Sequence, residues 1–343
     1  MKKATLADVA NLAGVSLGTV SKYINGITVL PKNAEKIQSV IDSIGYTPNT
    51  IARSFKSGRT MTVLLMIITE APVATTTWLH ELPIILGLTE ALKSRDYSLK
   101  IEIVNKEQVD VTAAHLETYA KSHSVDGIVL LTSWDVPSKL VAPLDYFEFP
   151  YIVVGSRSNG PGFGYIDFDN SSPICTLLHE LYDHGCRHFA LAGGFQDQRH
   201  MFYRTKGFVR GLKEIGIDVD SVPMLYGDYS LESGFQLGME ILRREPRADA
   251  IICGNDTIAA GVIRAAAELK IEIPTELKIT GFDNSVVSEA SVPTITSVSV
   301  PSMEMGLNAG TELIKRMQDQ NYVIKNQLLA CNIIYKKSTE ASC

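Results

Sequence analysis

The alternation of strand-like and helix-like segments that begins near residue 62 most constrains the fold of this chain. VLLMII at residues 63–68 is a short apolar run of the kind found in strands buried on both faces. A helix-patterned stretch follows it, and the alternation continues to a last strand expected in LLACNIIY, residues 328–335. Such alternation indicates parallel sheets with right-handed crossovers. The strands are too many for one ordinary sheet, so we expect two α/β lobes.

The remaining elements follow from the same pattern. We expect strands in SLKIEIV, VDGIVLL, YIVVG, GYIDF, HFALAG, VPMLY, AIICG, ELKITGFD and TITSVSV, and helices at about 79–94, up to about 122, and at 172–184, 203–214, 231–244, 257–269 and 302–317. Ligands of open parallel sheets bind beyond the carboxyl ends of the strands. Candidate binding residues are therefore sought there.

The N-terminal stretch TLADVANLAGVSLGTVSKYIN, residues 5–25, has a different pattern. It predicts two short helices joined at Gly14, since glycine tolerates the left-handed backbone of a helix end. Ser16 is placed to cap the second helix. Val20 and Ile24 face the first helix and leave a polar or small opposite face, formed by Leu17, Gly18, Thr19, Ser21 and Lys22. This is a helix-turn-helix, whose second helix is suited to a DNA major groove.

A third helix is expected to open at Pro31 and to end at Gly45, with an apolar stripe of Ile37, Ile41 and Ile44. An extended segment, residues 46–49, leads into the short helix TIARSFK at residues 50–56. A helix of about two turns is marginal in isolation. We therefore expect a hinge that becomes ordered only against a partner.

Charge is divided unevenly along the chain. Residues 1–62 carry eight Lys or Arg and three Asp or Glu, a net charge of +5, so the rest carries −11 of the total of −6. A basic head on an acidic body suggests that only the head approaches a polyanion. The five cysteines form no CxxC pair, no secretory signal is evident, and the apolar runs are far shorter than a membrane span. We expect a cytoplasmic protein with no membrane partner.

The sequence also contains candidate chemical sites that we weigh and set aside. His179, His184, Cys186 and His188 do not match zinc-finger spacing, and structural roles are expected for them. Asp167 and Asp169 have no evident acid or base partner. The sequence holds no Gly-rich phosphate loop, GxSxG or HExxH motif. We therefore expect no enzyme activity, no catalytic residues, no metal and no cofactor.

Four segments, TLADVANLAGVSLGTVSKYIN, IGYTPNTIARSFKSGRT, GNDTIAAG and ITGFDN, resemble the LacI/GalR family of bacterial transcription regulators. The resemblance implies a DNA-binding domain at 1–48, a hinge helix and linker at 49–61, and a core at 62–343 similar to periplasmic sugar-binding proteins. It places an N-lobe at about 62–168 and 300–329 and a C-lobe at about 169–299 and 330–343. It also implies a homodimer that reads a pseudo-palindromic operator.

By the same resemblance, Leu17, Gly18 and Lys22 face base edges, and Phe55 is a minor-groove wedge. For Phe55 the alternative is packing against its dimer mate. The other residues expected at the DNA, through phosphate contacts, helix caps or the hinge, are Thr5, Ser16, Thr19, Ser21, Asn25, Tyr46, Asn49, Ala52, Arg53 and Lys56.

For the ligand cleft, the resemblance assigns Arg204 as an anchor, whose planar fork suits vicinal hydroxyls or a carboxylate. The other candidates are Thr69, Trp78, Tyr229, Asn255 and Asp283. Each has a plain structural alternative. Arg204 would be a surface ion-pair residue, Asp283 a helix cap, and the two aromatic residues part of the core.

The expected function is therefore a DNA-binding repressor controlled by a small polar ligand, such as a sugar or sugar derivative, between two lobes. The alternatives are a sugar-binding protein and an enzyme on the same α/β core. The sequence does not decide whether the ligand releases the operator or strengthens its binding.

Overall fold

The computed structural model describes residues 4–24, 27–46, 59–70, 78–157 and 164–340, and for residues 78–80 the backbone alone. The chain divides into two compact units, residues 1–60 and 61–343. Each unit has a core of its own. No helix in the described part of the chain is long and apolar enough to span a bilayer.

The first unit is built from three helices, α1 (Leu6–Ala13), α2 (Leu17–Ile24) and α3 (Pro31–Ile44). Thr5 and Asp8 form a capping box at the start of α1, and Gly14 ends that helix at a φ of +65°. Pro31 opens α3, and Gly45 follows it in the left-handed region, as the sequence predicts. The three helices enclose a small core of Val9, Ala10, Ala13, Val20, Ile37 and Tyr46.

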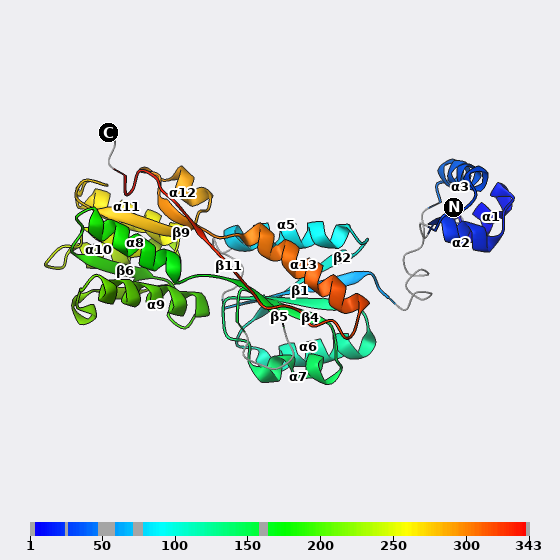
Figure 1. Ribbon diagram of the computed structural model, residues 1–343, viewed down its shortest axis with the longest axis horizontal. Helices are drawn as coiled ribbons and strands as arrows, with labels where there is room; N and C mark the ends of the chain where they lie inside the picture. The colour runs from blue at the N-terminus through cyan, green and yellow to red at the C-terminus, as the bar shows by residue number, and fades with distance from the viewer. Residues whose placement is uncertain (1–3, 25–26, 47–58, 71–77, 158–163, 341–343) are drawn as a thin grey trace. The chain divides into compact units, whose positions relative to one another are not determined.

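The second unit contains two six-stranded sheets (Figure 1). The first has the order β11-β5-β4-β3-β1-β2, with all neighbours parallel. Its strands are β1 (Thr62–Thr69), β2 (Ser98–Asn105), β3 (Gly127–Thr132), β4 (Tyr151–Val154), β5 (Gly164–Phe168) and β11 (Gln327–Leu329). Two helices lie on each face: α5 (Trp78–Lys93) and α13 (Ser302–Gln318) on one, α6 (Val109–Ser122) and α7 (Ser138–Tyr146) on the other.

The second sheet has the order β12-β10-β9-β8-β6-β7, and β12 is antiparallel to β10. Its strands are β6 (Phe189–Gly193), β7 (Met224–Tyr226), β8 (Ala250–Cys253), β9 (Lys278–Asp283), β10 (Thr296–Ser299) and β12 (Asn332–Ile334). Helices α8 (Ser172–Asp183) and α9 (Arg199–Glu214) cover one face. Helices α10 (Leu231–Leu242) and α11 (Asp256–Glu268) cover the other, and the short helix α12 (Val286–Ala290) and a 3-10 turn (Val219–Ser221) complete this half.

Three connections join the two sheets, after β5, after β10 and after β11 (Figure 1). The expected α/β class with parallel sheets is confirmed. LLACNIIY is not one strand, however. It forms β11 in one sheet and β12 in the other, because Ala330 and Cys331 carry the chain across. Helices α7 and α12 were not predicted, and α9 begins at Arg199, four residues earlier than the predicted start at Tyr203.

Strand β1 shows why its apolar run forms a central strand. Val63, Leu65 and Ile67 pack into the core under α5 and α13, while the alternate residues Leu64 and Met66 pack under α6 and α7. Successive side chains of a strand point to opposite faces, so a strand covered on both sides is apolar throughout.

Candidate functional site

The head presents the predicted reading face on α2. Ser16 Oγ accepts a hydrogen bond from the Thr19 amide at 3.1 Å, which caps the helix as predicted. Leu17 is 52% exposed, and Gly18 and Lys22 are also exposed. Val20 on the opposite side is fully buried. One face of α2 therefore stabilises the head, and the other is available to a partner.

Gly18 is not required by packing. A Cβ atom added there would meet Ser16 Oγ at 3.8 Å, an ordinary contact. Its hydrogen side chain leaves open space on the reading face of α2. Packing within the head therefore does not require glycine at position 18.

Other predicted DNA residues have structural roles in the head. Thr5 caps α1, and Tyr46 is buried in the core. Thr19 and Ser21 are partly buried on α2. The remaining DNA candidates, Asn25, Asn49, Ala52, Arg53, Phe55 and Lys56, lie outside the described residues.

In the second unit, Arg204 is the centre of a polar cluster. It lies on α9 and is 4% exposed, so the surface ion-pair alternative does not hold. Its Nε donates to Asn170 Oδ1 at 2.9 Å, its Nη1 donates to the Gly254 carbonyl at 2.5 Å, and its Nη2 lies 3.6 Å from Asp283 Oδ1. The guanidinium carbon lies 3.6 Å from the centre of the Phe282 ring. The guanidinium is therefore held in one orientation by three protein elements.

Asp283 ends β9 with a φ of +97°, a backbone region that non-glycine residues rarely adopt. Its carboxylate is partly exposed, at 18%. Strained backbone of this kind is concentrated at functional sites. Asp283 thus lies at a strand's carboxyl end with one oxygen toward Arg204, where a parallel sheet places its ligands.

Asn255 and Asp256 follow β8 and have local structural partners. Asn255 Oδ1 accepts from the Ile258 amide at 2.8 Å and so caps α11, which commits the oxygen that we expected to face a ligand. Asp256 is 1% exposed and accepts hydrogen bonds from the Ser285 amide and from Ser297 Oγ. Burial, and secondly the charge of Asp283, raise the pKa of Asp256 to about 7.

Tyr229 is 8% exposed and has a φ of +64°. Its ring lies directly on Gly194, because a Cβ there would approach Tyr229 Cζ to 2.0 Å. The ring also contacts Phe195 edge-on at 5.9 Å. Tyr229 Oη finds no hydrogen-bond partner among the described residues. Burial raises the pKa of Tyr229 to about 12; the charge of Arg204 opposes this shift and the charge of Asp283 adds to it, so the hydroxyl is neutral and can donate.

Glu81, in the first turn of α5, brings a carboxyl group from the other sheet. Its Oε2 is buried and has no partner within the described part of the chain. Burial raises the pKa of Glu81 to about 8; a backbone hydrogen bond opposes this shift and the charge of Asp283 adds to it. Glu81 is therefore within the range of the charge of Asp283, a member of the Arg204 cluster. Nothing in its local sequence pattern indicates this role.

Several polar contacts join the two sheet domains. Lys106 Nζ, after β2, pairs with Asp197 Oδ2 at 2.5 Å. The Arg199 amide donates to the Ser133 carbonyl at 2.9 Å, and Arg199 Nε lies 3.0 Å from Asp135 Oδ1. These contacts join the two sheet domains of the second unit.

A second buried ion cluster connects the two sheets at Asp167. Arg157 Nε donates to Asp167 Oδ2 at 2.8 Å, and His200 Nε2 lies 3.5 Å from Asp167 Oδ1. Burial acts to raise the pKa of Asp167, but His200 and Arg157 outweigh it, and the pKa is lowered. Asp169 is separate, because its Oδ1 accepts from the Ser171 and Ser172 amides at the start of α8. The two aspartates do not act as a pair.

Comparison with known proteins gives the same assignment for both units. The family profile "Bacterial regulatory proteins, lacI family" matches residues 5–49, and "Periplasmic binding protein-like domain" matches residues 178–339. The regulator CelR of Thermobifida fusca is 29% identical over 340 residues, which cover 98% of each chain. The chain therefore has a lacI-family DNA-binding domain and a periplasmic-binding-protein-like domain, and it is similar to a bacterial transcription regulator over almost its whole length.

Solved structures of LacI-family members share the fold. A CelR–cellobiose complex superposes with a TM-score of 0.71 at 28% identity, covering 98% of this chain and 100% of the other. The lac repressor dimer bound to operator and the anti-inducer ONPF gives a TM-score of 0.83 at 23% identity over 99% of this chain and 100% of that chain. The relatives are transcription regulators, not enzymes.

Two other predicted cleft residues, Thr69 and Trp78, have no described contact with the Arg204 cluster. Thr69 ends β1 and is partly buried, and its carbonyl accepts from the Lys106 amide. Trp78 begins α5, but its side chain lies outside the described residues. Of the six predicted cleft residues, Arg204 and Asp283 therefore lie in contact, and Tyr229 lies within the range of their charges.

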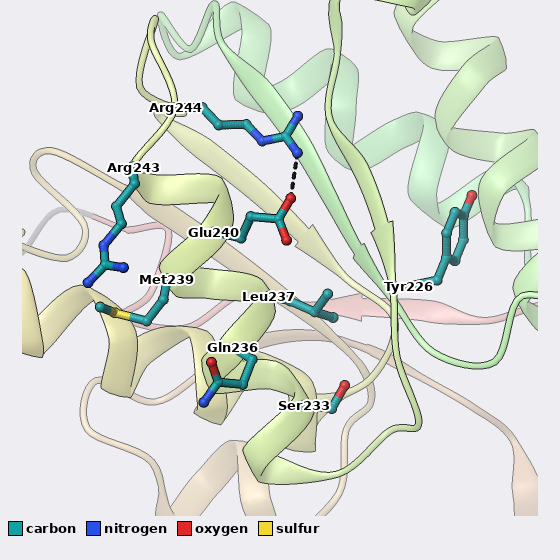
Figure 2. Close-up of a pocket in the computed structure, with 8 residues that line it drawn as sticks. All are labelled: Tyr226, Ser233, Gln236, Leu237, Met239, Glu240, Arg243 and Arg244. Carbon is teal, nitrogen blue, oxygen red and sulfur yellow. Dashed lines mark hydrogen bonds and ion pairs between the residues drawn. The ribbon is translucent and has the colours of Figure 1, made fainter.

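A separate hollow of about 590 Å³ lies between β7 and α10 (Figure 2). Its charged residues include Arg244, which pairs with Glu240 at 2.5 Å within α10. Its lining residues are Tyr226, Ser233, Gln236, Leu237, Met239, Glu240, Arg243 and Arg244. None of them belongs to the Arg204 cluster. None of its lining residues has a buried side-chain polar atom that lacks a hydrogen-bond partner in the described part of the chain, so we do not assign the ligand to it.

Proposed function

We propose that this LacI-family repressor binds a small polar ligand beside Arg204, Asp283 and Tyr229, and that the ligand controls operator affinity. The proposal is carried by the Tyr229 hydroxyl, which has no hydrogen-bond partner among the described residues, together with an oriented guanidinium and a strained aspartate at a strand end. Buried polar groups are nearly always paired. A ligand with hydroxyl groups supplies the missing partners for Tyr229 and for Glu81.

The charges around the site favour a neutral polyhydroxyl ligand, such as a sugar or sugar derivative. Arg204 already faces Asp283, and Glu81 adds a further carboxyl group. Sugar hydroxyls both donate to carboxylates and accept from guanidinium and phenol groups. The cellobiose in the CelR complex is in keeping with this ligand class.

DNA reading is assigned to Leu17, Gly18 and Lys22 on α2, with the hinge residues 49–61 between the head and the core. The proposed assembly is a homodimer on a pseudo-palindromic operator, like the dimer of the lac repressor complex. We propose the bacterial cytosol as its location, because operator DNA lies there. The ligand acts by changing the separation of the paired hinges, which order or melt with the operator.

Two measurements separate this function from its alternatives. A duplex selected from a random pool by the full-length protein is expected to bind with nanomolar affinity at physiological salt, about 10⁻⁸ M or tighter. A sugar-binding protein without DNA function would select no sequence. A thermal-shift panel of mono- and disaccharides then identifies the ligand, since binding to the native state alone raises the melting temperature. Turnover of the identified sugar would indicate an enzyme.

A further inference from the structure

A cysteine, a histidine and a glutamate converge on the outer side of α8 and α9, away from the residues assigned to the ligand. Cys175 Sγ donates to Glu214 Oε2 at 3.2 Å, and His179 Nε2 lies 2.9 Å from the same oxygen. The three potential ligand atoms all lie within 4.8 Å of one another. They have no part in the proposed ligand or DNA site.

The backbone places these three groups together. Cys175 and His179 are four residues apart and so lie on one face of α8. Glu214 is the last residue of α9, and the two helices approach closely at Gly211. A Cβ on Gly211 would lie 2.7 Å from Leu178 Cδ1 and 3.4 Å from the Cys175 Cα. Figure 1 shows α8 and α9 side by side on this half of the second unit.

We propose that Cys175, His179 and Glu214 form a binding site for a divalent transition-metal ion of the zinc type. Thiolate, imidazole and carboxylate are the three protein ligands that Zn²⁺ takes, and separations of about 3–4 Å between ligand atoms suit a tetrahedral ion with bonds of about 2.0–2.3 Å. The ion would replace the thiol proton that Cys175 now donates to Glu214 Oε2. That proton leaves to solvent, the neutral His179 ring binds through Nε2 and keeps its proton on Nδ1, and the fourth position is open to water.

The surroundings leave the site accessible. The side chains of His179 and Glu214 are 41% and 48% exposed, while Cys175 is buried beneath them at 6%. Arg210 is the opposing charge, since its Nε lies 3.7 Å from Glu214 Oε1 and its guanidinium is adjacent to the Cys175 thiol. A bound cation must displace this guanidinium. Removing the Arg210 charge should therefore strengthen metal binding.

The spacing pattern in the sequence did not indicate this trio. His179 lies near His184, Cys186 and His188 in the chain, but His184 Nδ1 is bonded to the Glu180 carbonyl and Cys186 Sγ faces the Asp249 carbonyl. The ligands that join His179 come from one turn earlier in α8 and from the next helix.

The test is a titration of the untagged, reduced and chelator-treated full-length protein with CoCl₂ and then ZnCl₂. We expect one Co²⁺ per chain with a near-ultraviolet thiolate-to-cobalt charge-transfer band, which Zn²⁺ abolishes by displacement. The band should be absent in Cys175→Ser, and His179→Ala and Glu214→Gln should each weaken binding by about 10-fold or more. His184→Ala and Cys331→Ser are the matched controls, and both should bind like the wild type.

Arg210→Gln should bind Co²⁺ more tightly than the wild type. Circular dichroism shows whether each variant is folded. If Cys175→Ser does not fold, Glu214→Gln still tests the site, because Glu214 is exposed. A charge-transfer band that survives in Cys175→Ser, weaker binding in Arg210→Gln, or no saturable binding by the wild type would overturn the proposal.

Discussion

Arg204 Nη2 lies 3.6 Å from Asp283 Oδ1, and the two residues reach this contact from α9 and from the end of β9. Each is constrained on its own side, Arg204 by Asn170 and Gly254 and Asp283 by its strained backbone. The pair is therefore positioned before any ligand arrives. Preorganisation of this kind reduces the ordering cost of binding.

Replacing Arg204 tests the ligand site. Arg204→Ala should abolish the response to the effector while DNA binding by the head is retained, because the head is a separate compact unit. Loss of a buried, paired charge should also destabilise the core by about 3–5 kcal/mol. Isothermal titration with the identified sugar and denaturant unfolding measure both effects.

Arg244→Ala is the matched control, because Arg244 pairs with the exposed Glu240 at the hollow between β7 and α10. It should change stability by less than about 1 kcal/mol and leave the response intact. An Arg204→Ala protein that still binds the sugar with wild-type affinity would remove Arg204 from the site.

Glu81 should make the stability of the ligand-free core depend on pH. The folded pKa is about 8, well above the ordinary value of 4.5, so the unfolded chain loses its proton first. The stabilising contribution of the neutral acid is complete below about pH 4.5 and is lost as pH rises through 8. Glu81→Gln should therefore match the wild type at about pH 5 and melt at least roughly 3 °C higher at about pH 9. Equal melting temperatures at both pH values would show that Glu81 is not buried in this way.

Lys22 is predicted to read one base. Lys22→Ala should lose discrimination of about 1–3 kcal/mol at one base pair in each half-site and leave other positions unchanged. The control Lys32→Ala alters an exposed lysine at the start of α3. Lys32→Ala should change the affinity for DNA only slightly, and by the same factor for every duplex. Binding of single-substituted duplexes by both variants distinguishes these outcomes, and a uniform loss in Lys22→Ala would assign Lys22 to phosphate contacts.

Two glycines of the head should respond oppositely to the same substitution. Gly18→Ala adds a methyl group in open space on a helix and should stabilise the head by about 0.5–1 kcal/mol. Gly14→Ala places a side chain at a φ of +65° and should cost about 1 kcal/mol or more. Amide hydrogen exchange of α1 to α3 measures both changes. Destabilisation by Gly18→Ala would mean that the reading face of α2 is packed against the head.

The fold of the head was predictable because its signals are local. The Ser16 cap, the left-handed Gly14 and the opening Pro31 each depend on neighbours within a few residues. The sheets were predictable as a class, because the central strands β1 and β3 are apolar on both faces. The division of LLACNIIY between two sheets was implied only by the family resemblance, which places a lobe boundary after residue 329, since nothing in a strand's own sequence says which sheet it joins.

The candidate site was predictable only in part. Arg204 and Asp283 follow from strand ends and resemblance, but their contacts with Asn170 and Gly254 require the assembled fold. Asn255 was predicted to face the ligand, but its side-chain oxygen caps its own helix. Position at a strand end does not reveal whether a side chain is used by the ligand or by the helix. Glu81 was missed because its unusual environment comes from another lobe and not from its helix.

The measurement that tests the account most directly is operator affinity against sugar concentration, with the selected duplex and full-length protein. Fluorescence anisotropy should show at least a fivefold change in wild-type affinity when the sugar found by thermal shift saturates the protein, about 1 kcal/mol of coupling or more. Asp283→Asn should reduce sugar binding and shift the response to higher sugar concentration. A sugar that binds the wild type tightly, yet leaves its operator affinity unchanged, would contradict the account.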